Sequence, residues 1–129
     1  MMPAPSRRSW ADSPRAIAAW QLLLAALMLA VCVLAFDPNP PDSLDTGWDK
    51  LNHALAFTIL TAVALLAAQR RPRPAVLAAL AMLAFGAFIE LVQTQIPGRS
   101  GEWPDLVADG AGIAAGLLAL HTGRHWLTL

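Results

Sequence analysis

Four ionisable side chains lie within or at the edge of otherwise apolar stretches, and their types could support acid–base chemistry. They are His53, Glu90, Asp105 and Asp109. A histidine beside carboxylates can act as a general acid or base. Carboxylates can also bind a hard divalent cation. We therefore take these four residues as the candidate catalytic groups.

Helical spacing adds neighbouring polar residues to this set. Three pairs would share a helix face at i,i+3 or i,i+4 spacing: Asp49 with His53, Glu90 with Gln93, and Asp105 with Asp109. Two cations accompany them: Lys50 suits a phosphate or carboxylate, and Arg99 suits bidentate contact. The predicted ligand-binding residues are Asp49, Lys50, His53, Glu90, Gln93, Arg99, Asp105 and Asp109.

Glu90 is the most informative of these residues, because an apolar run surrounds it. A charged group at the bilayer centre costs at least ~2.5–3.5 kcal/mol. Glu90 should therefore find a partner, such as Arg99, Lys50 or His53, or remain protonated. The structural alternative is a polar contact that only holds the helices in register.

The other residues have plain explanations as well. His53 could be an interfacial hydrogen-bonding group, and Asp49 could be only a helix N-cap. Asp105 follows Pro104 and could likewise only start a helix. The convergence of several such groups on one place favours a functional site over any of these separate explanations.

The composition indicates that membrane-spanning helices position these residues. Of the 129 residues, 57% are apolar and 14% are charged, whereas soluble domains average about 45–50% and 25%. Four spans of about 20 residues leave no room for a separate soluble domain. The apolar runs are 16–36, 51–68, 75–96 and 106–120. Since hydrocarbon requires helices or closed barrels, we predict an all-α membrane protein with four transmembrane helices.

The predicted organisation has three parts. Residues 1–15 form a flexible cytoplasmic arm, residues 16–120 form the four-helix membrane domain, and residues 121–129 form a cytoplasmic tail. The first run could instead be a cleaved signal peptide. Its 21 residues exceed the usual apolar region of about 7–15 residues, which favours a retained span.

Basic residues predict the orientation. Seven of the nine lie in the arm, in the connection near residues 70–73 and in the tail, and an excess of Lys and Arg marks the cytoplasmic side. Both termini should therefore be cytoplasmic, and loops 37–50 and 97–105 should face outward. The candidate site then opens to the outside of the membrane. Trp20 and Trp126 should lie near the inner interface, and Trp48 and Trp103 near the outer one.

Some classes of function are disfavoured. The net charge of zero gives no basic surface for nucleic acid. The single cysteine, Cys32, excludes an intrachain disulfide and a cysteine-based metal cluster. No string of metal ligands such as His-Glu-x-x-His is present, so we predict no metal or cofactor from a motif.

Three segments resemble the VanZ-like family. Residues 48–53, Trp-Asp-Lys-Leu-Asn-His, resemble its Asp-Lys-x-x-His opening, and residues 90–93, Glu-Leu-Val-Gln, resemble its Glu-x-x-Gln element. Residues 97–99, Pro-Gly-Arg, with Asp105 and Gly112, resemble its closing element. The resemblance runs from Trp48 to Leu120, and the first span matches by position.

One departure is Asp109, where many family members carry Asn; it adds a carboxylate to the site. The resemblance implies a small multi-pass protein of the bacterial inner (cytoplasmic) membrane that acts in the cell envelope. The namesake of the family is associated with resistance to the glycopeptide teicoplanin. The resemblance carries over no defined biochemical activity.

Three hypotheses follow. In the first, the outward pocket binds the head group of a lipid-linked envelope precursor or a lipoglycopeptide. In the second, the same residues form an acid–base or metal-assisted enzyme that acts on a lipid-linked substrate, although no nucleophile motif is apparent. In the third, the chain is a small proton-coupled exporter, which needs an acid accessible from both sides. Glu90 lies toward the outside, which disfavours the exporter; the oligomeric state stays open.

Overall fold

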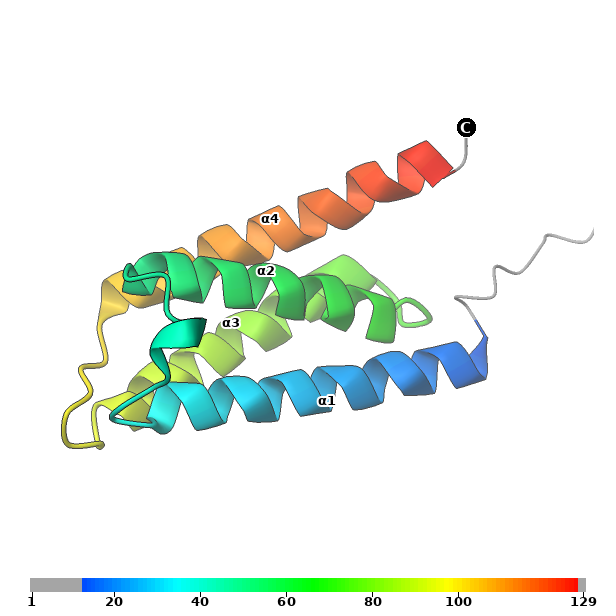
Figure 1. Cartoon of the computed structure of the whole chain (residues 1–129). Helices are drawn as coiled ribbons and strands as arrows, with labels where there is room; N and C mark the ends of the chain where they lie inside the picture. The colour runs from blue at the N-terminus through cyan, green and yellow to red at the C-terminus, as the bar shows by residue number, and fades with distance from the viewer. Residues whose placement is uncertain (1–12, 128–129) are drawn as a thin grey trace, which may run out of the picture.

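The computed structural model describes residues 13–127, which form four long α-helices joined by short connections (Figure 1). The elements are α1 (Pro14–Phe36), the 3-10 turn η2 (Asp42–Leu44), α2 (Asp49–Ala67), α3 (Pro74–Gln93) and α4 (Trp103–Leu127). Within this described part there is no strand, and four helices are long and apolar enough to cross a membrane. The prediction of an all-α chain with four candidate spans is confirmed.

Local chemistry moves the helix ends by a few residues from the predicted runs. α1 begins at Pro14 because the Ser13 side chain accepts a hydrogen bond from Ala16 N at 3.1 Å, and proline suits the first helical position. α3 ends at Gln93, before the predicted residue 96, and α4 extends beyond 106–120 at both ends. Of the predicted arm and tail, residues 1–12 and 128–129 lie outside the described residues.

Helix α2 is the centre of the bundle. It packs against α1, α3 and α4, and its contact with α4 is the most extensive. The buried core comes mainly from α2 and α3, with one residue of α4: Phe57, Leu60, Ala64, Leu65, Ala78, Met82, Phe85, Ile89 and Ile113. Large apolar side chains on the outer faces, such as Leu22, Leu80 and Leu118, are exposed. That distribution suits a helix bundle surrounded by lipid.

Glycines bring α4 close to α2. A Cβ atom at Gly112 would overlap the backbone oxygen of Ala54, and one at Gly116 would lie 2.5 Å from that of Thr58. Small residues at such spacing let two helix backbones approach. The predicted packed face of α4 is therefore confirmed, and it is the face that carries Asp105 and Asp109.

All the predicted site residues lie at one end of the bundle. At this end, which we call the polar end, α1 and α3 finish and α2 and α4 start, on the left in Figure 1. Trp48 and Trp103 are exposed there, as expected of residues at a membrane interface. The opposite end holds the α2–α3 connection, where Arg73 has a left-handed backbone with φ 52°. Which end faces the cytoplasm stays a prediction.

Candidate functional site

Three helices and one loop bring the eight predicted residues together at the polar end. Asp49, Lys50 and His53 come from the first turns of α2, Glu90 and Gln93 from the last turn of α3, Arg99 from the α3–α4 connection, and Asp105 and Asp109 from the start of α4. The predicted convergence of α2, α3 and α4 is therefore seen in the structure. Asp49 follows Trp48, which is the N-cap of α2, so the interpretation of Asp49 as only an N-cap is wrong.

His53 is the centre of the cluster. Its Nδ1 lies 2.7 Å from Asp109 Oδ1, a distance that fits an Nδ1–H donating to the carboxylate. The same nitrogen lies 3.9 Å from Glu90 Oε1. On the other side of the ring, Nε2 lies 4.0 Å from Asp49 Oδ2. One imidazole therefore faces carboxylates contributed by α2, α3 and α4.

Asp109 is fully buried between helices, with 0% of its surface exposed. Its Oδ1 binds His53, whereas its Oδ2 has no hydrogen-bond partner. The carboxylate fits against α3 because position 86 is glycine: a Cβ at Gly86 would lie 2.5 Å from Asp109 Oδ2. Burying an unpaired carboxylate oxygen is costly, so Asp109 Oδ2 remains able to accept a donor or to bind a cation.

Glu90 is 9% exposed, and only one of its two carboxylate oxygens has a hydrogen-bond partner. Its Oε2 accepts a hydrogen bond from the backbone N–H of Glu102 at 2.8 Å. Its Oε1 has no hydrogen-bond partner and faces His53. Of the partners expected for Glu90, the structure therefore favours His53, and it adds a backbone amide from the loop that precedes α4.

Lys50 pairs with α4. Its Nζ donates to Asp105 Oδ1 at 3.4 Å and lies 3.9 Å from Glu102 Oε2. Asp105 is 2% exposed, so this ion pair ties the first turn of α2 to the first turn of α4. Glu102 was missed as a site residue because its role depends on the path of the loop.

Arg99 and Gln93 hold the carboxyl end of α1. Arg99 Nε donates to Asp37 O at 2.9 Å, and Nη2 donates to Leu34 O at 2.7 Å. Gln93 Nε2 donates to Ala35 O at 3.0 Å. The last carbonyls of a helix have no partners within it and carry partial negative charge, which explains the attraction of a guanidinium. The two described Arg99 bonds therefore go to the protein's own backbone.

Sequence reasoning also missed a small network in the α1–α2 connection. Asn52 Nδ2 donates to Asp45 Oδ1 at 2.7 Å, and Asn52 Oδ1 accepts from Thr46 N and Thr46 Oγ1 at 3.0 and 2.7 Å. The Asn52 hydrogen bond, followed by that of the Gly47 N–H, lowers the pKa of the Asp45 carboxyl. The turn residues Asp-Thr-Gly before α2 were the available signal.

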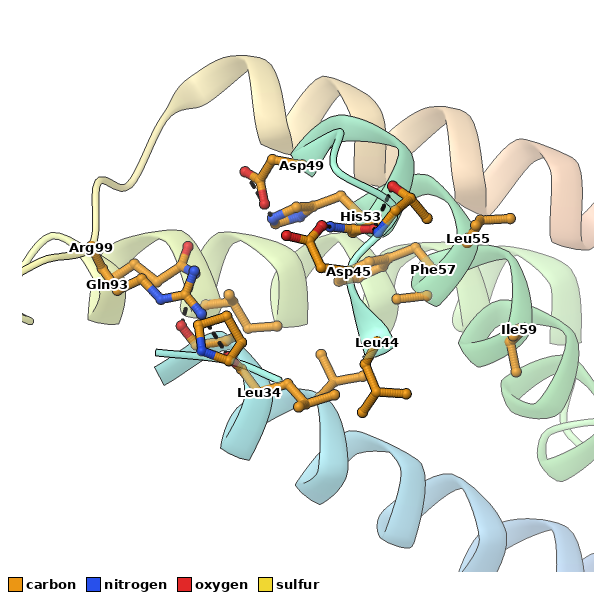
Figure 2. A pocket seen from close by; sticks show the side chains of 17 residues that line it. Leu34, Leu44, Asp45, Asp49, His53, Leu55, Phe57, Ile59, Gln93 and Arg99 are labelled. Carbon is orange, nitrogen blue, oxygen red and sulfur yellow. Dashed lines mark hydrogen bonds and ion pairs between the residues drawn. The ribbon is translucent and has the colours of Figure 1, made fainter. Parts of the chain in front are cut away.

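A pocket of about 330 Å³ lies between α1, α2, α3 and the α1–α2 connection (Figure 2). Its polar lining includes Asp45, Asp49, Asn52, His53, Gln93 and Arg99. The remaining lining is mostly apolar and includes Leu34, Leu44, Leu55, Phe57 and Ile59. Leu44, Leu55 and Ile59 are also exposed on the outside of the bundle. The pocket therefore has a polar part, and it has an apolar part whose lining residues also reach the outer surface of the bundle.

The three motif segments thus meet at one place, and comparison with known proteins gives the family. The family VanZ/LLP1 matches residues 8–124. The chain belongs to this family. A search of curated proteins and a search of solved structures found no match. The resemblance predicted over residues 48–120, with the first span by position, is confirmed.

This VanZ/LLP1 chain offers two sets of side chains that could hold a metal ion. One is His53, Glu90 and Asp109, and the other is Asp49, His53 and Asp105. In each set the candidate ligand atoms all lie within 4.8 Å of one another. Neither set forms a continuous sequence motif, because its residues come from different helices.

Proposed function

We propose that this VanZ/LLP1 protein binds the head group of a lipid-linked or lipidated envelope molecule in the bacterial cytoplasmic membrane. In this proposal the termini are cytoplasmic and the polar end faces outward. The four apolar helices support residence in a lipid bilayer. The distribution of basic residues supports the orientation.

The amphipathic pocket is the observation that carries the proposal. Its polar residues lie toward the end of the bundle, and Leu55 and Ile59 extend its lining along α2 toward the middle (Figure 2). Leu55 and Ile59 are also exposed on the outer surface of the bundle, so an acyl or polyprenyl chain could enter the pocket from the lipid side. A ligand with a polar head and an apolar tail fits both parts of this lining.

The polar lining suggests which head groups suit the pocket. Asp45 and Asp49 provide carboxylates, which bind amines and sugar hydroxyls. Gln93 Oε1 is buried without a hydrogen-bond partner and can accept one more hydrogen bond. Arg99 would contact a phosphate or carboxylate beside the α1 carbonyls that it already binds. We therefore favour an acylated head group that carries amino and hydroxyl groups, with an acidic group near Arg99.

The remaining predicted residues would act through the wall of the pocket. His53 lines it directly, and Glu90 and Asp109 orient His53. Lys50 and Asp105 join α2 to α4 behind this wall. A lipoglycopeptide such as teicoplanin has the required combination of acyl chain, sugars and amine. Binding of such a molecule would link the protein to glycopeptide tolerance.

The test is binding of fluorescent teicoplanin to the purified full chain in nanodiscs, compared with the same molecule without its acyl chain. We expect the acylated form to bind at least tenfold more tightly. Ile59→Trp, which fills the pocket, should weaken binding at least tenfold, whereas Leu80→Trp on the exposed face of α3 should not. Equal binding by both variants, or equal binding of both ligands, would exclude this pocket as the site.

A second function has specific support. The pairing of His53 with Asp109 beside the half-satisfied Glu90 provides acid–base groups next to the pocket. Asp105 lies on the same face of α4. An enzyme that acts on a lipid-linked substrate would use these groups. Turnover of a polyprenyl-phosphate-linked sugar that is lost in His53→Ala but not in Leu80→Ala, on the exposed face of α3, would favour this alternative over binding alone.

A further inference from the structure

We infer that His53, Glu90 and Asp109 form a binding site for one divalent transition-metal ion such as Zn²⁺ or Mn²⁺. This inference goes beyond the proposed function, since the metal site shares only His53 with the pocket lining and does not depend on which lipid binds. It rests on the positions of the three side chains, on two unpartnered oxygens and on the local balance of charge.

The first argument is geometric. His53 Nδ1 lies 2.7 Å from Asp109 Oδ1 and 3.9 Å from Glu90 Oε1, and one ligand atom from each residue lies within 4.8 Å of the others. With metal–ligand bonds of about 2.0–2.2 Å, tetrahedral ligands are separated by about 3.3–3.6 Å. The two distances from His53 Nδ1, 2.7 and 3.9 Å, lie on either side of that separation. Small side-chain rotations would place all three ligand atoms around one ion.

The second argument comes from unsatisfied buried atoms. Asp109 is fully buried, and its Oδ2 has no hydrogen-bond partner. Glu90 Oε1 is also without one, and it faces the same imidazole nitrogen. Buried polar atoms normally have partners, and an absent ion is one reason for an exception. The unpartnered Glu90 Oε1 and the Asp109 carboxylate thus both lie at the Nδ1 side of His53, where they could bind one cation together.

The third argument is the charge around the cluster. The two permanent cations predicted for the site are engaged elsewhere: Lys50 binds Asp105 and Glu102, and Arg99 binds carbonyls at the end of α1. Among the described residues, the ion pairs of Glu90 and Asp109 are both with His53, and Glu90 also accepts a hydrogen bond from the Glu102 backbone N–H. A divalent ion would balance both carboxylates in a region where isolated charges are costly.

The surroundings of His53 also suit a metal ligand. Its Nε2 points toward Asp49 Oδ2 at 4.0 Å, and metal-binding histidines commonly direct their second ring nitrogen at a carboxylate. An ion bound at Nδ1 would displace the proton that otherwise bonds to Asp109. One imidazole with two carboxylates is a mixed ligand set, which suits Zn²⁺ or Mn²⁺ better than Ca²⁺ or Mg²⁺. Three protein ligands would leave a coordination position for water or a ligand oxygen.

The test is metal binding by the full chain purified in detergent and stripped with a chelator. We expect one Zn²⁺ per chain by calorimetry and elemental analysis, with proton release when Zn²⁺ displaces the His53 proton. Mn²⁺ should bind at the same place and compete with Zn²⁺. No binding of either ion, or binding without competition between them, would overturn the inference.

Variants identify the ligands. Glu90→Gln and Asp109→Asn should each weaken Zn²⁺ binding more than 100-fold. Asp49→Asn should weaken it about 10–100-fold, as expected of a group that orients a ligand. Asp42→Asn in η2 is the matched control and should bind as the unaltered chain does. Circular dichroism and gel filtration check folding, and Glu90→Gln, which keeps an acceptor for Glu102 N–H, serves if the Asp109 variant misfolds.

The second set of possible ligands gives the opposing outcome. If Asp105→Asn abolishes Zn²⁺ binding while Glu90→Gln leaves it unchanged, the ion binds Asp49, His53 and Asp105 instead, and the inference is wrong. Teicoplanin binding measured with and without chelator separates the two proposals. If teicoplanin still binds without metal, the pocket proposal stands by itself. The Zn²⁺ titration then decides the metal-site proposal independently.

Discussion

His53 and Asp109 lie 56 positions apart in the chain, yet the imidazole Nδ1 and the carboxylate Oδ1 are separated by 2.7 Å. This pair joins the central helix α2 to α4 at the polar end. It is possible because Gly112 and Gly116, one and two turns farther along α4, allow the two backbones to approach. Small residues on one face of α4 thus bring two ionisable residues into hydrogen-bonding distance.

Substitutions of His53 and Asp109 should lower the free energy of unfolding by different amounts. His53→Ala leaves the Asp109 carboxylate buried without its partner, and we expect a loss of about 3–5 kcal/mol in the free energy of unfolding. Asp109→Asn keeps an acceptor without the charge and should cost about 1 kcal/mol. In the Asp109→Asn background, His53→Ala should cost less, with a coupling energy of about 0.5–3 kcal/mol. Unfolding by sodium dodecyl sulfate in mixed micelles measures the free energy of unfolding of the unaltered chain, the two single variants and the double variant. Additive losses would mean that the pair is not coupled.

The close approach of α4 to α2 should depend on Gly112. Gly112→Ala introduces a methyl group against the backbone oxygen of Ala54, and such overpacking typically costs about 1–3 kcal/mol. Gly110→Ala is the matched control, because no atom lies within 4 Å of a Cβ there. It should stabilise the helix by about 0.5–1 kcal/mol. The same unfolding assay compares them, and equal effects of the two substitutions would contradict the packing.

Arg99 should act as a clamp on α1. Arg99→Ala removes two charge-assisted hydrogen bonds to the carbonyls of Leu34 and Asp37. We expect a loss of about 1–3 kcal/mol, reduced from a fully buried pair because the side chain is partly exposed. Arg99→Lys should recover only part of this, since lysine lacks the planar fork. Arg71→Ala, exposed at the opposite end, should change stability by less than about 0.5 kcal/mol.

The α1–α2 connection should loosen in acid. Because the pKa of Asp45 is lowered in the folded chain, first by its hydrogen bond from Asn52, its contribution is present at neutral pH. That contribution declines as the pH falls below the ordinary value of 3.8 and through the lower folded value. Carbon-13 NMR of the Asp45 carboxyl should show the lowered pKa, and Asn52→Ala should raise it. An unchanged titration in Asn52→Ala would contradict this network.

The orientation of the bundle can be measured with reporter fusions. A green fluorescent protein fused after residue 129 should fluoresce, and alkaline phosphatase at the same place should be inactive, because we expect a cytoplasmic C-terminus. Phosphatase inserted in the η2 connection should be active. An active C-terminal phosphatase fusion would place the polar end in the cytoplasm and exclude an outward-facing pocket.

The sequence by itself determined the number and type of the elements. Four apolar runs of membrane-spanning length predict helices, because the hydrocarbon interior leaves no other partner for backbone groups in single spans. It also indicated which residues share a helix face, since spacing of three or four along a helix is a local property. Asp49 with His53, and Asp105 with Asp109, followed from that spacing. The three motif segments likewise indicated the VanZ/LLP1 family, because their residue types and spacing are properties of the sequence.

Only the tertiary structure decided which of these groups meet. His53 binds Asp109 more closely than Asp49, although Asp49 is its neighbour on the same helix face. Arg99 reaches the carbonyls of α1, and the Glu102 amide reaches Glu90, because loop paths and helix contacts determine these distances. Such contacts join residues on different helices and loops, whose relative positions depend on where glycines allow close packing. Helical periodicity therefore predicts a face, whereas the packing of whole helices selects the partner.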